Sequence, residues 1–270
     1  MTSFLLHPSE LAYGLANARS AHVIGWGDAR FLPAGATDAD LDAWVDQGAE
    51  RLLAAGGLTG TSDEGLNFAA PVAEIIMTLA DPTLVLLVER KVGDGMRRMT
   101  VHFANNTAFG MIRRADGMFE IVRYAELTAA AVACAAYLGM ALSPVEAGTH
   151  LTSTFEGMKD IRTLAKADQI EAASSKLTEI GATTEEAASI LEAMTAPRSS
   201  GGFSILYCAG NKALNAQSFS VMSNAEGETW SLFPQGSVNG PMILERSSVQ
   251  ALAGRVIVTI AAQLELAKAG

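Results

Sequence analysis

Two stretches of the chain repeat one order of predicted elements, and this repeat constrains the fold more than any single motif. The letters LAAGGL at residues 53–58 correspond to LTEIGA at 177–182, and IIMTLADP at 75–82 corresponds to ILEAMTAP at 190–197. In each stretch a helix ends at a glycine, a second helix ends before a proline, and strands follow. The sequence therefore predicts an internal duplication, with related α+β halves at residues 1–140 and 141–270.

The first half shows the patterns of two helices, a series of strands and a closing helix. Thr37 is a typical cap for the first helix, with Asp40 three residues on, and Pro71 fits the first turn of the second helix. Strands are predicted over residues 83–92, 99–103, 109–114 and 118–124, and a helix of small residues over 127–138.

The second half repeats this order. A helix is predicted over residues 170–179, and Thr183 with Glu186 forms a capping-box signature for the next helix. Strands are predicted over residues 203–209, 218–221, 229–233 and 242–245, and a final helix begins near Val249.

A sheet of about four strands with one apolar face needs cover, and each half has only a few helices. Two related halves can pair their sheets about a pseudo-twofold axis. We therefore expect an α+β fold with a large, mostly antiparallel sheet flanked by helical bundles. One face of that sheet can stay open to a partner.

Composition narrows the class of protein. The net charge of −10 disfavours a nucleic-acid partner, because such proteins carry a basic face for phosphates. The longest apolar runs, residues 84–88 and 256–262, are far shorter than the roughly 20 residues of a membrane span. The N-terminus has no positive segment before an apolar run. These features predict a cytoplasmic protein without membrane insertion.

The sequence contains no recognisable catalytic motif and no cofactor-binding motif. The glycines at residues 56–60 follow a helix rather than a strand, so we interpret them as a helix stop, not a phosphate loop. Cys134 and Cys208 are interpreted as small apolar residues, without support for a disulfide between them. We expect a protein that is not an enzyme and holds no cofactor.

Metal sites are also not predicted. Asp38, Asp40 and Asp42 resemble the start of a calcium loop, but Ala43 and Ala49 stand where that loop needs glycine and glutamate. No histidines are paired at a helical spacing, and His102 is expected on the polar side of its strand.

A partner-binding surface is the functional signal that remains. The chain has eleven methionines, a residue type that adapts its shape to apolar partners. Aromatic residues on the second-half strands can serve as anchors if their sheet face is open, and as core otherwise. The predicted partner-binding residues are Phe219, Met222, Trp230, Phe233 and Met242.

The order of elements resembles the EspG family of type VII (ESX) secretion chaperones. The segments that carry the likeness are SFLLHPSELAYGLANA at 3–18, AERLLAAGGL at 49–58, APVAEIIMTLADPTLVLLVER at 70–90 and MTVHFANNTAFGMIRRADGMFEIVRY at 99–124. The likeness lies in the pattern over most of the chain. Trp26 and Trp44 have no clear counterpart in that family, and the loop at residues 234–241 has no clear equivalent in the first half of the chain.

The resemblance implies a cytosolic chaperone, a monomer or homodimer, that binds a PE–PPE heterodimer. It would cover the apolar helical tip of the client with its open sheet face and second-half helices. Two other interpretations stay open: a winged-helix-like regulator of protein or DNA, and a small-molecule enzyme or ligand-binding protein with a pocket between the halves.

Overall fold

The computed structural model describes residues 2–20, 22–27, 31–33, 35–60, 66–140, 150–209, 212–236 and 240–269, with side chains up to residue 262. Among the helices described, none combines the length and apolar character of a membrane-crossing segment. The predicted boundary between residues 140 and 141 falls at the segment 141–149, which lies outside the described residues.

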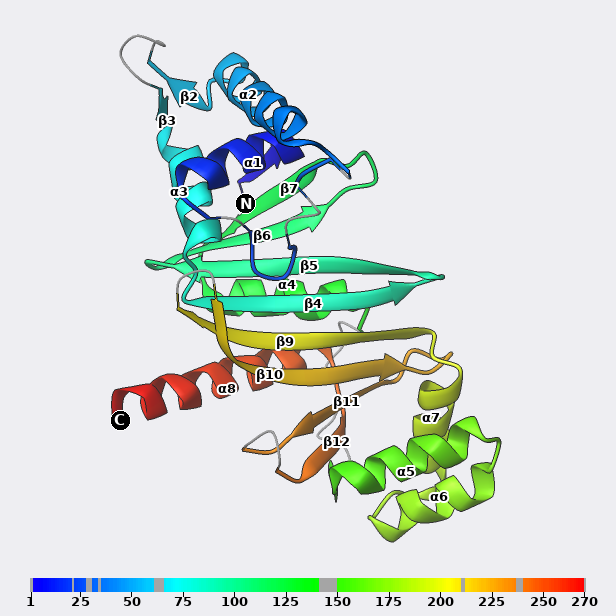
Figure 1. The fold of residues 1–270 in the computed structure, drawn as a ribbon. Helices are drawn as coiled ribbons and strands as arrows, with labels where there is room; N and C mark the ends of the chain where they lie inside the picture. The colour runs from blue at the N-terminus through cyan, green and yellow to red at the C-terminus, as the bar shows by residue number, and fades with distance from the viewer. Residues whose placement is uncertain are drawn as a thin grey trace. The chain divides into compact units, whose positions relative to one another are not determined.

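A sheet with the strand order β1-β7-β6-β5-β4-β9-β10-β11-β12-β8 forms the framework (Figure 1). Its strands are β1 (Ser3–Leu6), β4 (Leu84–Val92), β5 (Gly95–Ala104), β6 (Thr107–Arg113), β7 (Phe119–Tyr124), β8 (His150–Ser153), β9 (Ser199–Ala209), β10 (Lys212–Ser223), β11 (Thr229–Pro234) and β12 (Met242–Arg246). Pairing is antiparallel at β1–β7, β5–β6, β6–β7, β10–β11, β11–β12 and β12–β8.

The helices and a minor hairpin complete the described elements. The helices are α1 (Pro8–Asn17), α2 (Asp38–Ala54), α3 (Ala70–Ala80), α4 (Leu127–Tyr137), α5 (Phe155–Lys166), α6 (Ile170–Glu179), α7 (Thr184–Thr195) and α8 (Val249–Ala269). The hairpin pairs β2 (Leu58–Thr59) with β3 (Asn67–Phe68). The predicted α+β class and the large antiparallel sheet are therefore confirmed.

The strand order has a regularity that bears on the predicted duplication. From β4 outward the order is β4, β5, β6, β7 and then β1, and from β9 outward it is β9, β10, β11, β12 and then β8. In both series four successive strands are followed by the strand of the same sheet that comes before them in the chain. This connectivity is what a duplication would produce, and the duplication itself stays a prediction.

The first of two compact units contains residues up to 86, 99–127 and 206–216. Its core packs residues from α1, α2 and α3 against Phe109, Met111, Phe119 and Ile121 of β6 and β7. The predicted cap is present: Thr37 Oγ1 accepts from the backbone N–H of Asp40, whose carboxylate accepts in return. The predicted glycine stop follows α2, where Gly56 has a φ of 72°.

One expectation about this unit is wrong. His102 lies in the interior and is fully buried, not on a polar sheet face. Its Nε2 is 2.9 Å from Thr100 Oγ1, and that oxygen accepts a 2.7 Å hydrogen bond from Trp26 Nε1. The alternation does place Thr100 and His102 on one face of β5. That face is covered because the segment around Trp26 packs over it. The alternation of residues within a strand cannot predict such a contact with a distant segment.

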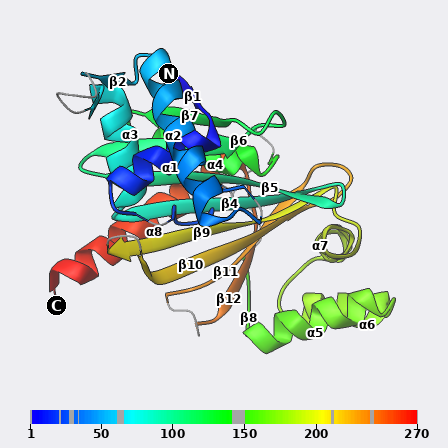
Figure 2. The same ribbon diagram turned by 45° about the horizontal axis from the view of Figure 1, so that its top comes forward.

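The second unit contains residues 87–98, 128–205 and 217–270. Helices α5, α6 and α7 lie together (Figure 2), and their shared core includes Met158, Ile161, Leu177 and Ile190. Thr183 and Glu186 form the predicted capping box of α7. Two elements of this unit, β8 and α5, have no counterpart among the predicted helices and strands.

Candidate functional site

A groove of about 550 Å³ opens within the second unit. Helix α5 contributes Phe155, Met158, Lys159 and Arg162 to its lining, and α7 contributes Ala193 and Met194. The opposite wall comes from strands: Met222 of β10, Leu232 of β11 and Met242 of β12. Glu89, Lys91 and Met96 lie at its edge on β4 and β5. The groove therefore lies between a helical wall and a sheet wall of the same unit.

Methionine dominates this lining. Five of the eleven methionines of the chain line the groove: Met96, Met158, Met194, Met222 and Met242. Unbranched thioether side chains adjust their shape easily, so a groove lined by them suits an apolar protein segment more than a small rigid ligand.

Two large apolar side chains of the groove are exposed to solvent. Phe155 is 62% exposed and Met96 is 60% exposed. Phe155 is the first residue of α5, directly after the cap Thr154, whose Oγ1 accepts from the backbone N–H of Gly157. The cap sets where α5 begins and thereby places the Phe155 ring at the groove rather than in the core.

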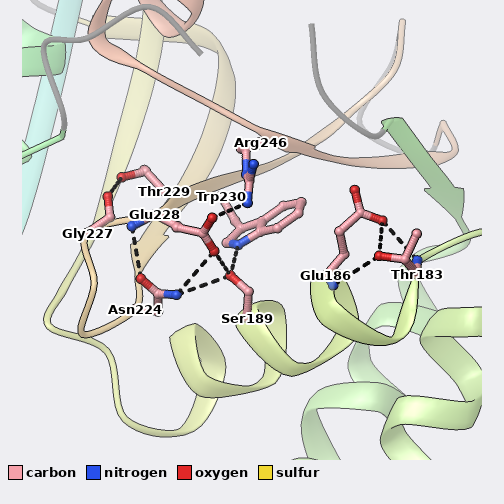
Figure 3. A network of polar contacts seen from close by, with 9 residues as sticks. All are labelled: Thr183, Glu186, Ser189, Asn224, Gly227, Glu228, Thr229, Trp230 and Arg246. Atoms are coloured by element: carbon pink, nitrogen blue, oxygen red, sulfur yellow. Dashed lines mark hydrogen bonds and ion pairs between the residues drawn. The ribbon is translucent and has the colours of Figure 1, made fainter. Parts of the chain in front are cut away.

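A polar network fixes the helical wall to the sheet wall (Figure 3). Ser189 on α7 accepts a 3.0 Å hydrogen bond from Trp230 Nε1 and donates to the Glu228 carboxylate. Arg246 of β12 pairs with the same carboxylate and lies over the Trp230 ring, 5.8 Å from its centroid. Asn224 donates to Ser189 and Glu228 from the turn between β10 and β11. Because Ser189 is one turn before Ala193 and Met194, this network positions the part of α7 that lines the groove.

The structure divides the five predicted partner-binding residues between two sheet faces. Met222 pairs with Trp230 across β10 and β11, and Met242 follows on the same face of β12. Met222 and Met242 line the groove, whereas Trp230 is buried beneath it in the network of Ser189.

Phe219 and Phe233 lie on the opposite face. Their ring centroids are 5.3 Å apart, and both side chains are buried. Arg255 of α8 lies 4.8 Å from the centroid of Phe233, so α8 covers this face. For Phe219, Trp230 and Phe233 the structure favours the core alternative. Contact of Met222 and Met242 with a partner stays a prediction.

Sequence reasoning missed Met96, Phe155, Met158 and Met194 as groove residues. A signal for α5 was present, since Thr154 is a good cap and Met158, Ile161 and Ala165 recur at helical spacing. Nothing in the sequence indicated that Met96 and Phe155 would come to one groove, because that depends on the packing of α5 beside the sheet.

The two cysteine thiols are not activated for nucleophilic chemistry. Burial raises the pKa of the Cys134 thiol, and it raises the pKa of the Cys208 thiol to about 11, so both stay protonated near neutral pH. Both cysteines are free. Among the described side chains, no three His, Cys, Asp or Glu residues gather closely enough to share a metal ion.

Comparison with known proteins gives a likeness in structure and none in sequence. No family model matches the chain, and no curated protein does. The structure is similar to that of the Mycobacterium tuberculosis type VII secretion system chaperone EspG5, solved in complex with the PE25–PPE41 dimer. The TM-score is 0.67 over 93% of each chain, at 12% sequence identity. The chain therefore has an EspG-like fold.

Proposed function

We propose that the protein is a cytosolic, non-enzymatic chaperone of type VII secretion that binds and solubilises a helical PE–PPE-like client. The observation that carries the proposal is a methionine-lined groove, with Phe155 and Met96 exposed at it, on the fold of a chaperone that binds a PE–PPE dimer. The client would insert an apolar helical tip between α5 and the strands β10 to β12.

The physical basis is the removal of apolar surface from water on both partners. A large apolar side chain gains about 1.5–3 kcal/mol when it becomes fully buried, so Phe155 and Met96 can each contribute about 1–2 kcal/mol from their exposed parts. The client gains in the same way, because an apolar helical tip left in water promotes aggregation. Binding at the groove would therefore keep such a client soluble.

The proposal is tested by co-expression with the PE–PPE pairs encoded in the same genome. We expect one pair to become soluble and to co-elute with the protein from a size-exclusion column. The variants Phe155→Asp and Met96→Asp should abolish co-elution, because each places a carboxylate in the apolar groove. Both variants should fold normally, since the native side chains are exposed and an acidic residue suits the first turn of α5.

The matched control is Leu214→Asp. Leu214 is 71% exposed on β10 but does not line the groove. This variant should co-elute with the client as the native protein does. The proposal fails if no pair co-elutes, or if the control variant loses the client as completely as the groove variants.

A further inference from the structure

The groove carries a positive rim on a strongly acidic chain. Lys91 of β4, together with Lys159 and Arg162 of α5, lines the groove, although the net charge of the chain is −10. The one carboxylate among the described lining residues is Glu89. It accepts a 3.0 Å hydrogen bond from Arg98 Nε, so its charge is already compensated.

The three rim cations have little compensation of their own. Lys159 pairs with Glu156 at 3.0 Å within α5, but both side chains are more than 60% exposed, and such pairs are weak in water. In the part of the chain that the structure describes, neither Lys91 nor Arg162 has an ion-pair partner. Lysine and arginine can lay their aliphatic stems along the apolar lining while their charged ends remain in solvent.

We propose that the segment received by this groove is an apolar helical tip flanked by acidic side chains, and that Lys91, Lys159 and Arg162 select for those acidic residues. This inference rests on the proposed chaperone function and names the chemistry of its client. Apolar contacts would supply most of the affinity, and the rim charges would set the orientation and exclude basic segments.

Two stapled helical peptides with the same leucine tip test this selection, one with glutamate flanks and one with lysine flanks. Fluorescence anisotropy with the full-length protein at low salt should show the acidic peptide binding about tenfold tighter, from about 0.2–1 kcal/mol for each exposed ion pair. The ratio should approach one near 1 M salt, where the Debye length falls to about 3 Å.

Charge reversal locates the effect on the protein. Lys91→Glu and Arg162→Glu should each weaken binding of the acidic peptide about threefold and strengthen binding of the basic peptide. Lys212→Glu makes the same change of charge at an exposed β10 lysine outside the groove, and it should leave both affinities unchanged.

Equal affinity for the two peptides, preference for the basic peptide, or binding of neither would overturn the selection by charge. An effect of Lys212→Glu as large as that of Lys91→Glu would also overturn it, since net charge alone would then account for the result. The chaperone proposal is judged separately by co-elution with a PE–PPE pair. If Phe155→Asp abolishes co-elution while the peptides show no preference, only the inference about acidic flanks fails.

Discussion

One sheet face in each unit can be compared with the other: that of strands β5 to β7 in the first and that of β10 to β12 in the second. In both cases the strands are neighbours in the sheet in the order in which they occur in the chain. The two faces differ in how they are covered. In the first unit the helices and the segment around Trp26 seal the face so fully that even Thr100 and His102 are buried. In the second unit α5 and α7 cover the core and leave a groove lined by five methionines.

If the groove is the docking surface that we propose, exposure rather than apolar content distinguishes it from the sealed core. The sealed face contains polar groups, which are tolerated because Trp26, Thr100 and His102 are linked by hydrogen bonds. At the groove beside the second face, Phe155 of α5 and Met96 of β5 keep apolar surface in water, and such exposure is unfavourable unless a partner covers it.

The largest expected effect is at the sealed face. Trp26→Ala should lower the free energy of unfolding by about 3–5 kcal/mol, because it leaves a cavity beside Phe119 and removes the donor to Thr100. Trp26→Phe keeps most of the ring volume and should cost only about 1–2 kcal/mol. Urea denaturation measures both values. A cost below about 1 kcal/mol for Trp26→Ala would show that this segment does not seal the face.

A second, smaller effect concerns pH. Burial lowers the pKa of His102 to about 3 from an ordinary value of 6.5, so the unfolded chain takes up the proton first. The stability contributed by neutral His102 is complete above pH 6.5 and is lost as the pH falls toward 3. Between pH 7 and pH 5 the loss should be about 2 kcal/mol, from 1.36 kcal/mol for each pH unit below 6.5.

The variant His102→Gln isolates this contribution, since an amide can still bond to Thr100 but does not titrate. Urea denaturation at pH 7 and pH 5 should show a drop in stability that is about 2 kcal/mol smaller for the variant than for the native protein. An equal drop for both would mean that His102 is not neutral and buried in solution.

Local patterns predicted the elements well, because caps and prolines act within a few residues. Thr37 and Thr183 begin helices in the structure as their side chains indicate, and Pro82 and Pro197 follow the ends of α3 and α7. The EspG-like fold was also anticipated, from the order of these elements. The error at His102 and the missed position of Phe155 at the groove have one physical cause. Burial of a strand face or a helix end depends on which distant segment packs over it.

The same limit applies to the site. The pattern of strands indicated Met222 and Met242, which do line the groove, together with Phe219 and Phe233, which lie under α8. Alternation places Phe219 and Met222 on opposite faces of β10, because they are three residues apart. It does not tell which face α8 covers and which face borders the groove, since that depends on the packing of distant helices.

The smallest expected effect on stability is at the open groove. Phe155→Ala and Met96→Ala should each change the free energy of unfolding by less than about 0.5 kcal/mol, since neither side chain is part of the core. Each should nevertheless weaken co-elution with a PE–PPE client. Because the free energy of unfolding is almost unchanged, a loss of co-elution would report weaker binding directly. A loss of stability comparable with that of Trp26→Ala would show that the groove closes over these side chains in solution. The contrast between a sealed face and an open one would then disappear, because both faces would serve as core.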